Sequence, residues 1–176
     1  CARISNLIVS VVRAELREFD RLHPPRDAEW VAWLRKRRAA AAAAGAPIDD
    51  FACLHCLGMF VDDELGASAD DLLYTLDGAP VCGADGVQWR RAQQHFDIAR
   101  RVLMRFGWGS EPSKEVPPCE ALVALGVSID LQSGRMALSE GKRARYGRAA
   151  AAIASQRDTS RGELQSLLGR LQFAAQ

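Results

Sequence analysis

The sequence has no long hydrophobic run, no excess of either charge and no secretory signal. No apolar stretch in its 176 residues approaches the ~18 that a membrane span needs, so we expect a soluble protein without a membrane partner. The first twenty residues lack both a basic-then-apolar pattern and a small-residue cleavage site. An intracellular location is therefore expected, with nucleus and cytoplasm not distinguished. The net charge of +1 argues against a strongly basic nucleic-acid binder, if charge is taken over the whole chain.

Disorder is excluded by composition, because 48% hydrophobic residues and 26% charged residues are enough to form a core. The length favours one domain, or one domain and a fraction of another. The chain begins with Cys1 and stops inside the helical pattern of residues 171–176. Both ends look cut, and we interpret the sequence as a piece of a longer protein.

The cysteines do not form a recognisable framework. Their number is five, which is odd, and their spacing is irregular, so reduced intracellular thiols are expected. Cys53 and Cys56 have CxxC spacing, which suggests zinc, but no second pair follows downstream. In an extended strand these two positions point to opposite faces. We therefore expect no zinc.

Hydrophobic spacing and capping residues predict an α+β fold. Helices are expected over residues 2–22, from the N-cap Asp27 to Ala44, over 86–106 and over 139–155, and a capping box at Ser160 and Glu163 starts another. Residues 51–68 read as a hairpin with acidic residues at its tip, and 69–85 as a loop. A second hairpin is expected from strands 122–130 and 135–138.

Divided by segment, the net charge of +1 is a cancellation. Residues 49–85 hold nine acidic side chains and no Lys or Arg, whereas residues 1–48 and 139–176 each carry a net +4 and residues 86–115 carry +3. An acidic hairpin between basic helices suits a divalent cation held by carboxylates, with a polyanion around it.

The sequence Phe60-Val61-Asp62-Asp63 is the most informative short motif. Adjacent carboxylates at a hairpin tip repel each other unless a cation compensates them, and Mg²⁺ binds carboxylate oxygens while leaving positions open for phosphate. Other Asp-Asp pairs occur at 49–50 and 70–71 and read as solvated loops. Only the pair at 62–63 has an apolar strand on each side.

The ordered set of motifs around this tetrapeptide resembles a reverse transcriptase (RNA-directed DNA polymerase) of a retroelement. Residues 51–68 resemble the aromatic-x-Asp-Asp hairpin of the palm, with Phe60 where Tyr is commoner. Residues 2–4 and the helix after them look like the end of motif B, and residues 103–114 look like motif D and its lysine. Residues 125–138 resemble the motif E hairpin, the primer grip. The helices downstream, including residues 164–171, resemble the thumb side of DIRS-like and Ty3-like elements.

This resemblance implies a partial palm over residues 1–138, with a helical insertion near 24–48, and the start of thumb or connection helices over 139–176. It implies template-directed nucleotidyl transfer from dNTPs on an RNA or DNA template-primer, with two Mg²⁺ ions that Mn²⁺ can replace. Asp62 and Asp63 would be the metal-binding, catalytic carboxylates, and Lys114 would protonate the leaving pyrophosphate. The nucleic-acid contacts implied by the same resemblance are Phe60, Gly126, Lys142, Arg143, Arg145 and Arg148.

One part of the family pattern is missing. The third palm carboxylate lies on a motif A strand before motif B, and the sequence starts at or inside motif B. Asp20 and Asp27 lie at a helix end and in a linker, so we expect neither to replace it. The chain is thus expected to be inactive alone. The alternative is a non-catalytic, retroelement-derived scaffold or interaction subunit, with another chain covering the truncated palm edge. His23, His55 and His95 show no partner pattern, and no role is assigned to them.

Overall fold

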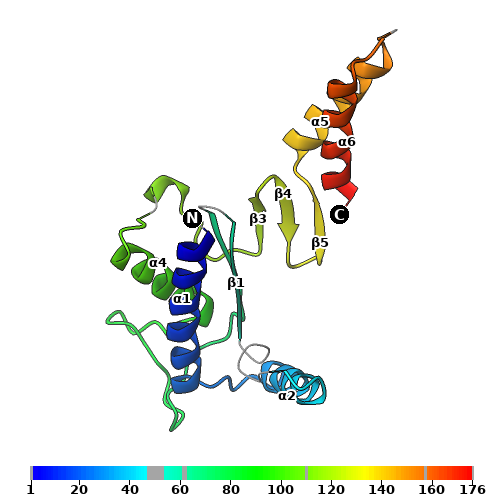
Figure 1. Cartoon of the computed structure of the whole chain (residues 1–176). Coiled ribbons are helices and arrows are strands. Elements are labelled where there is room, and N and C mark those ends of the chain that lie inside the picture. Colours follow the sequence, from blue (N-terminus) through cyan, green and yellow to red (C-terminus); the bar gives the residue numbers. More distant parts are fainter. Residues whose placement is uncertain (1, 47–53, 61–62, 110, 157, 176) are drawn as a thin grey trace. The chain divides into compact units, whose positions relative to one another are not determined.

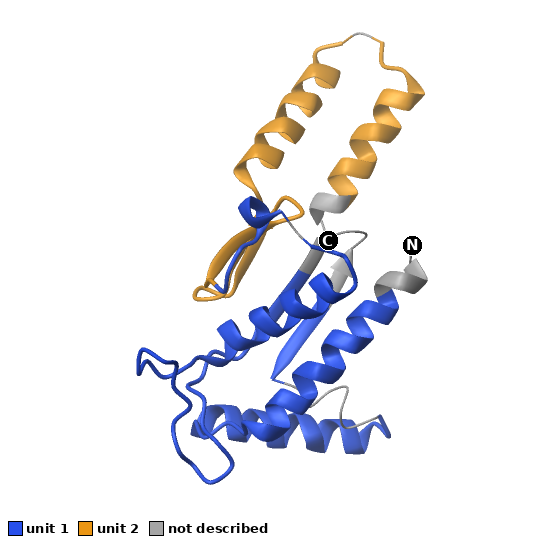
Figure 2. Cartoon of the chain, turned by 90° about the vertical axis from the view of Figure 1, so that its left-hand side faces the viewer, with its two compact units in different colours: residues 1–118 blue, residues 119–176 orange. Residues whose placement is uncertain are grey.

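The computed structural model describes residues 2–46, 54–60, 63–109, 111–156 and 158–175, without the side chains of 2–5, 58–60, 63–64 and 173–175. Within these residues it contains five α-helices and two small antiparallel sheets (Figure 1), which confirms the α+β class. The chain divides into two compact units, residues 1–118 and 119–176 (Figure 2). No helix in the described part of the chain is long and apolar enough to cross a membrane.

The first unit is built on two helices and a hairpin. Helix α1 (Ala2–Leu22) packs against α4 (Arg91–Arg105), and both contact the antiparallel pair β1 (His55–Phe60) and β2 (Asp63–Ser68) (Figure 1). The apolar face of α1 repeats every four residues through Ile8, Val12 and Leu16, as the 3.6-residue period requires. These side chains form one buried core with Leu57, Ile98 and Val102. The predicted helix 2–22 and the predicted hairpin are both confirmed.

Helix α2 (Ala28–Ala43) begins where the sequence predicts. The Asp27 carboxylate accepts hydrogen bonds from the backbone N–H groups of Glu29 and Trp30, which confirms its role as N-cap. Buried Leu34 packs with Leu54 and Ala69 in a second, smaller cluster. The helix is therefore attached to the first unit along one apolar strip.

Residues 69–90 differ from the expected loop and helix. Isolated antiparallel bridges join Leu72 to Arg90 and Cys82 to Gln88, and the backbone N–H of Trp89 donates to Val81 at 2.8 Å. These bonds hold residues 87–90 extended, so α4 starts at Arg91 and not at 86. The predicted helix starts too early because residues 87–90, which have helical spacing, instead form antiparallel hydrogen bonds with residues 72–82. That segment was predicted to be a loop.

The second unit contains a three-stranded sheet and a helix pair. Strands β3 (Ala121–Ala124), β4 (Val127–Asp130) and β5 (Arg135–Leu138) form the sheet. Helices α5 (Glu140–Ala154) and α6 (Arg161–Ala175) pack side by side (Figure 2). Prediction of a single strand over 122–130 is wrong: Leu125 and Gly126, with φ of 51° and 75°, form a tight turn that splits it.

Local signals in this unit are otherwise confirmed. Ser160 and Glu163 make the reciprocal bonds of a capping box, from Ser160 N–H to the Glu163 carboxylate at 2.9 Å and from Glu163 N–H to Ser160 Oγ at 3.3 Å. The units divide after Pro118, whereas the sequence placed the boundary after 138. The three-stranded sheet belongs with α5 because Ser139 N–H donates to Gly126 O at 2.9 Å, tying the start of that helix to the β3–β4 turn.

Candidate functional site

The hairpin that carries the predicted metal site has an unambiguous register. Phe60 of β1 pairs with Asp63 of β2, so only residues 61 and 62 separate the paired positions. Asp62 lies outside the described residues, as do the side chains of Phe60 and Asp63. The register thus puts Asp63 at the first position of β2, and the roles given to all three residues stay predictions.

Lys114 closes a short 3₁₀ turn, η1 (Pro112–Lys114), that follows α4. Its ammonium lies 3.0 Å from the Glu111 carboxylate, and its side chain is 77% exposed. A salt bridge this exposed contributes at most about 1 kcal/mol. The lysine is therefore accessible to a phosphate, and its predicted role as a proton donor remains a prediction.

Gly126 and Lys142, both predicted to contact nucleic acid, contact each other. The Lys142 ammonium donates a hydrogen bond to Leu125 O, and its stem crosses the turn so closely that a Cβ on Gly126 would lie 2.1 Å from Lys142 Cε. The positive φ favours glycine here, and any Cβ would also push the Lys142 side chain away from the turn. The lysine stem thereby fixes the turn to the first turn of α5.

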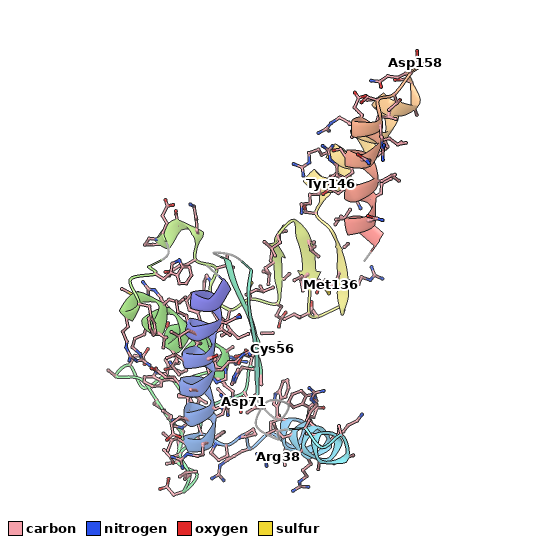
Figure 3. All side chains as sticks on the ribbon, viewed as in Figure 1. Arg38, Cys56, Asp71, Met136, Tyr146 and Asp158 are labelled. Carbon is pink, nitrogen blue, oxygen red and sulfur yellow. The ribbon has the colours of Figure 1, made fainter. Side chains whose placement is uncertain are left out.

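The remaining predicted nucleic-acid contacts lie along α5. Arg143, Arg145 and Arg148 are exposed, and the Arg145 guanidinium lies 5.5 Å from the ring centre of its neighbour Tyr146. Figure 3 shows Tyr146 on this helix, where it is the buried residue. The exposed arginines offer positive charge to solvent without bearing on the small core of the unit.

A buried polar cluster in the first unit was not predicted. At its centre is Arg91, whose side chain is 0% exposed. The guanidinium donates to both carboxylate oxygens of Asp71, at 2.5 and 3.0 Å, to Asp20 Oδ1 at 2.6 Å and to His23 O at 2.7 Å. Figure 3 shows Asp71 beside α1. One side chain of α4 therefore joins α1 to the start of the segment after β2.

Two histidines complete the hydrogen-bond partners of the Asp20 carboxylate. His95 Nε2 lies 2.9 Å from Asp20 Oδ1, and His55 Nδ1 lies 3.2 Å from Asp20 Oδ2. On its other side, His95 Nδ1 is 2.7 Å from the hydroxyl of Ser68. Asp20, His55 and His95 come from α1, β1 and α4, and one ligand atom of each lies within 4.8 Å of the others. The geometry is that of a potential metal site as well as of a hydrogen-bond network.

Electrostatics favour an ionised Asp20 carboxylate and a neutral His95 imidazole. Burial alone would raise the pKa of Asp20, but hydrogen bonds from His55 and His95, with the charge of Arg91, hold that pKa well below its usual range. Burial lowers the pKa of His95, although Asp20 opposes the shift. The pKa of Arg91 is raised because Asp71 and Asp20 outweigh its desolvation.

The cluster lies at the opposite end of the hairpin from the acidic turn. His55 is the first residue of β1 and Phe60 the last, so at about 3.3 Å per residue the two ends are about 17 Å apart. Asp20 is bonded at the His55 end. The expectation that Asp20 cannot serve as the third palm carboxylate therefore has a geometric basis.

The sequence held a signal for this cluster that was not used. Asp20 continues the four-residue repeat of Ile8, Val12 and Leu16 on the buried face of α1, and His95 shares the face of α4 that buries Ile98 and Val102. A polar residue on an apolar stripe must find a buried partner. Two such residues on two helices would have suggested that they meet.

Cys56 is exposed on β1, and Cys53 lies outside the described residues, so the proposed absence of zinc at this pair remains a prediction. Comparison of the chain with protein-family models, with curated proteins and with solved structures gave no match.

Proposed function

We propose that this chain forms part of the palm and thumb of a reverse transcriptase, which adds nucleotides from dNTPs to a primer on an RNA or DNA template. The observation that carries the proposal is the β1–β2 register, which pairs Phe60 with Asp63 and leaves only two residues of the chain, 61 and 62, between them. The hairpin contacts two helices, α1 before it and α4 after it in the chain. This is the arrangement that the family resemblance leads one to expect.

The order of the later elements supports the same proposal. After α4 come a short turn carrying Lys114, a small antiparallel sheet and two helices. In the family these correspond to motif D, the primer grip of motif E and the thumb. At the tight turn of Gly126 the space without a Cβ is filled by the Lys142 stem, which holds the predicted primer-grip turn against the first turn of α5.

The chemistry assigned to the turn is two-metal nucleotidyl transfer. Asp62 and Asp63 would hold Mg²⁺, which lowers the barrier by stabilising the attacking primer oxygen and the leaving pyrophosphate. Segment 49–85 has nine acidic residues and no basic ones. Two of the acids, Asp70 and Asp71, pair with Arg90 and Arg91 at the other end of the hairpin, so the charge at the turn comes from its own carboxylates. The metal ions supply the positive charge that a triphosphate and two adjacent carboxylates require.

We further propose that the chain alone does not polymerise. The mechanism needs a third carboxylate at the metals, and Asp20 is committed to His55, His95 and Arg91 at the other end of the hairpin. Loss of a group that stabilises transition-state charge commonly lowers the rate by about 10²–10³. Primer extension with Mg²⁺ tests this: processive synthesis by the chain, abolished by Asp62→Asn, would contradict the proposal.

A second candidate, a non-catalytic scaffold, is favoured by one observation. Leu164, Leu168 and Leu171 of α6 are 47%, 51% and 43% exposed and recur at helical spacing. An interaction subunit would use such a stripe. A scaffold without metal or nucleic-acid binding fails both experiments below, whereas a polymerase part passes them.

The first experiment tests the metal site at the turn. Mn²⁺ added to the labelled chain should broaden the amide NMR signals of β1 and β2 near the turn, and the double variant Asp62→Asn/Asp63→Asn should abolish the broadening. The double variant Asp49→Asn/Asp50→Asn removes the same charge from the same acidic segment and should preserve it. Equal broadening in both variants would show diffuse attraction of cations and would contradict the proposal.

The second experiment tests the nucleic-acid surface of α5. Binding of a primer-template duplex is measured against salt concentration, and the slope of log K on log salt gives the number of phosphates neutralised. Changing four α5 residues to Gln should lower the slope by up to about 3–4, at about 0.9 per contact. A matched variant changes four basic residues of α2 and should leave the slope unaltered. The two sets are Lys142, Arg143, Arg145 and Arg148, and Arg35, Lys36, Arg37 and Arg38. Equal effects of the two sets would refute a specific role for α5.

A further inference from the structure

The first unit contains three potential metal ligands that the proposed polymerase function does not use. Asp20, His55 and His95 converge from α1, β1 and α4 with one ligand atom each within 4.8 Å. Ligands at about 2.0–2.2 Å from a tetrahedral zinc are separated by about 3.3–3.6 Å. His55 Nδ1 lies 3.2 Å from Asp20 Oδ2, close to this range, and His95 Nε2 lies 2.9 Å from the other oxygen, Oδ1, a little closer than a shared metal would hold them. We propose that these three residues bind a divalent transition metal, with Zn²⁺ as the best fit.

The charge balance of the cluster supports a cation. Arg91 and Asp71 form a buried bidentate pair whose charges cancel. What remains is the carboxylate of Asp20, which is only 13% exposed, beside two imidazoles that are each 5% exposed. Arg91 also donates to Asp20 Oδ1 at 2.6 Å, so one guanidinium is shared by two buried carboxylates, and Asp20 can still bind a cation. An imidazole binds a metal through the lone pair of one ring nitrogen.

The surroundings of the ligands are those of a metal site. Ser68 Oγ lies 3.0 Å from Ala69 O, to which it can donate, and it can then accept the Nδ1–H of His95 at 2.7 Å. In that tautomer His95 Nε2 would carry the lone pair that a metal requires, in place of the N–H that it donates to Asp20 when no metal is bound. A metal-binding histidine usually donates its other N–H to an oxygen in this way. Arg91 likewise holds Asp20 Oδ1 and leaves Oδ2 directed toward His55.

The burial of the site points to a structural metal. Both histidine side chains are 5% exposed, so a substrate has no access, and a water would be the fourth ligand of a bound ion. The ion would join α1, β1 and α4 at the end of the hairpin opposite the acidic turn. Its donors are hard and borderline, two nitrogens and one oxygen, which suits Zn²⁺ or Co²⁺ and excludes a site dedicated to Mg²⁺.

The test is metal binding by the full chain after chelator treatment and alkylation of its cysteines, which removes thiolate ligands. Zn²⁺ titrated in a calorimeter should bind at one equivalent and raise the melting temperature of the first unit. Co²⁺ should give the visible absorption of a tetrahedral site. His55→Gln should weaken Zn²⁺ binding at least about tenfold. The same loss is expected for His95→Gln.

His23→Gln is the matched control. His23 lies beside the cluster and its Nδ1 is 3.0 Å from Tyr74 O, but it offers no ligand to the site. This variant should bind Zn²⁺ as tightly as the unmodified chain. Tryptophan fluorescence and circular dichroism establish whether each variant is folded. If His95→Gln does not fold, the Zn²⁺ affinity of His55→Gln alone tests the proposal. The proposal is overturned if the folded chain takes up no Zn²⁺, if His23→Gln weakens binding equally, or if one-equivalent binding survives in His55→Gln. Mn²⁺ broadening at the acidic turn is independent of these results, so either proposal can fail alone.

Discussion

Replacement of Arg91 by Met should destabilise the first unit far more than replacement of its neighbour Arg90. Arg91 is 0% exposed and donates to Asp71, Asp20 and His23 O. Met fills most of the volume, so the main loss is the charge that compensates two buried carboxylates. Removing one partner of a buried ion pair costs about 3–5 kcal/mol. Arg90 pairs with Asp70, but these side chains are 56% and 50% exposed, and such a pair contributes about 0–1 kcal/mol.

Urea unfolding followed by tryptophan fluorescence measures this difference. All four tryptophans, at 30, 33, 89 and 108, belong to the first unit, so the signal does not report the second. With a denaturant dependence of about 1–3 kcal/mol per molar urea, Arg91→Met should lower the midpoint by about 2 M and Arg90→Met by less than about 0.5 M.

A double variant separates the ion pair from simple packing. Asp71→Asn/Arg91→Met also removes one of the two carboxylate charges that Arg91→Met leaves buried without their partner, and it should be more stable than Arg91→Met alone. Arg91→Lys keeps the positive charge but cannot make the bidentate hydrogen bond, so its stability should lie between that of Arg91→Met and that of the unmodified chain. If Arg91→Met does not differ from Arg90→Met by more than about 1 kcal/mol, which is the limit for an exposed pair, the reasoning on burial is refuted.

Three further outcomes follow from the structure. The pKa values of His95 and Asp20 are lowered in the folded state, so on acidification the unfolded chain binds protons before the folded one does. The first unit should therefore lose stability as the pH falls below 6.5, because of His95, and again below 3.8, because of Asp20. Urea midpoints measured against pH test this, and His95→Gln should remove the loss that begins at 6.5. Leu16→Ala, at a residue 2% exposed in the core, should cost about 2–5 kcal/mol in the same assay. Gly126→Ala should speed amide hydrogen exchange in the second unit more than Gly134→Ala does. Both glycines have positive φ, but only a Cβ at 126 would meet Lys142. Equal exchange rates in the two variants would assign the loss of stability to φ alone.

Local chemistry made much of this fold predictable. The helix after Asp27 and the helix after Ser160 begin at their predicted caps, because a cap satisfies backbone N–H groups within three residues of itself. The hairpin over 51–68 follows from apolar runs on both sides of an acidic turn. In each case the decisive interaction joins residues that are close in sequence.

Features decided by distant residues were not predictable in the same way. Helical spacing over 86–106 gave no sign that Trp89 would be hydrogen-bonded to Val81 and Leu73. The tight turn at Leu125 places a leucine at φ 51°, where turn preferences favour Gly or Asn, so the strand was read through it. The candidate metal ligands belong to three elements up to 75 residues apart, and no spacing rule connects them. Arg90 and Arg91 are indistinguishable as sequence, yet only Arg91 is buried.

The core of the first unit has a consequence for its synthesis on the ribosome. Ile8 and Val12, near the beginning of the chain, are covered by Ile98 and Val102 of α4, so most of this core cannot close until nearly the whole unit has been translated. Until then α1 presents its apolar stripe to the surroundings, a state in which nascent chains aggregate or recruit chaperones. The second unit pairs each strand with the next one along the chain, and such local contacts form quickly. Although it is synthesised after the first unit, its sheet and helices can fold as soon as they emerge.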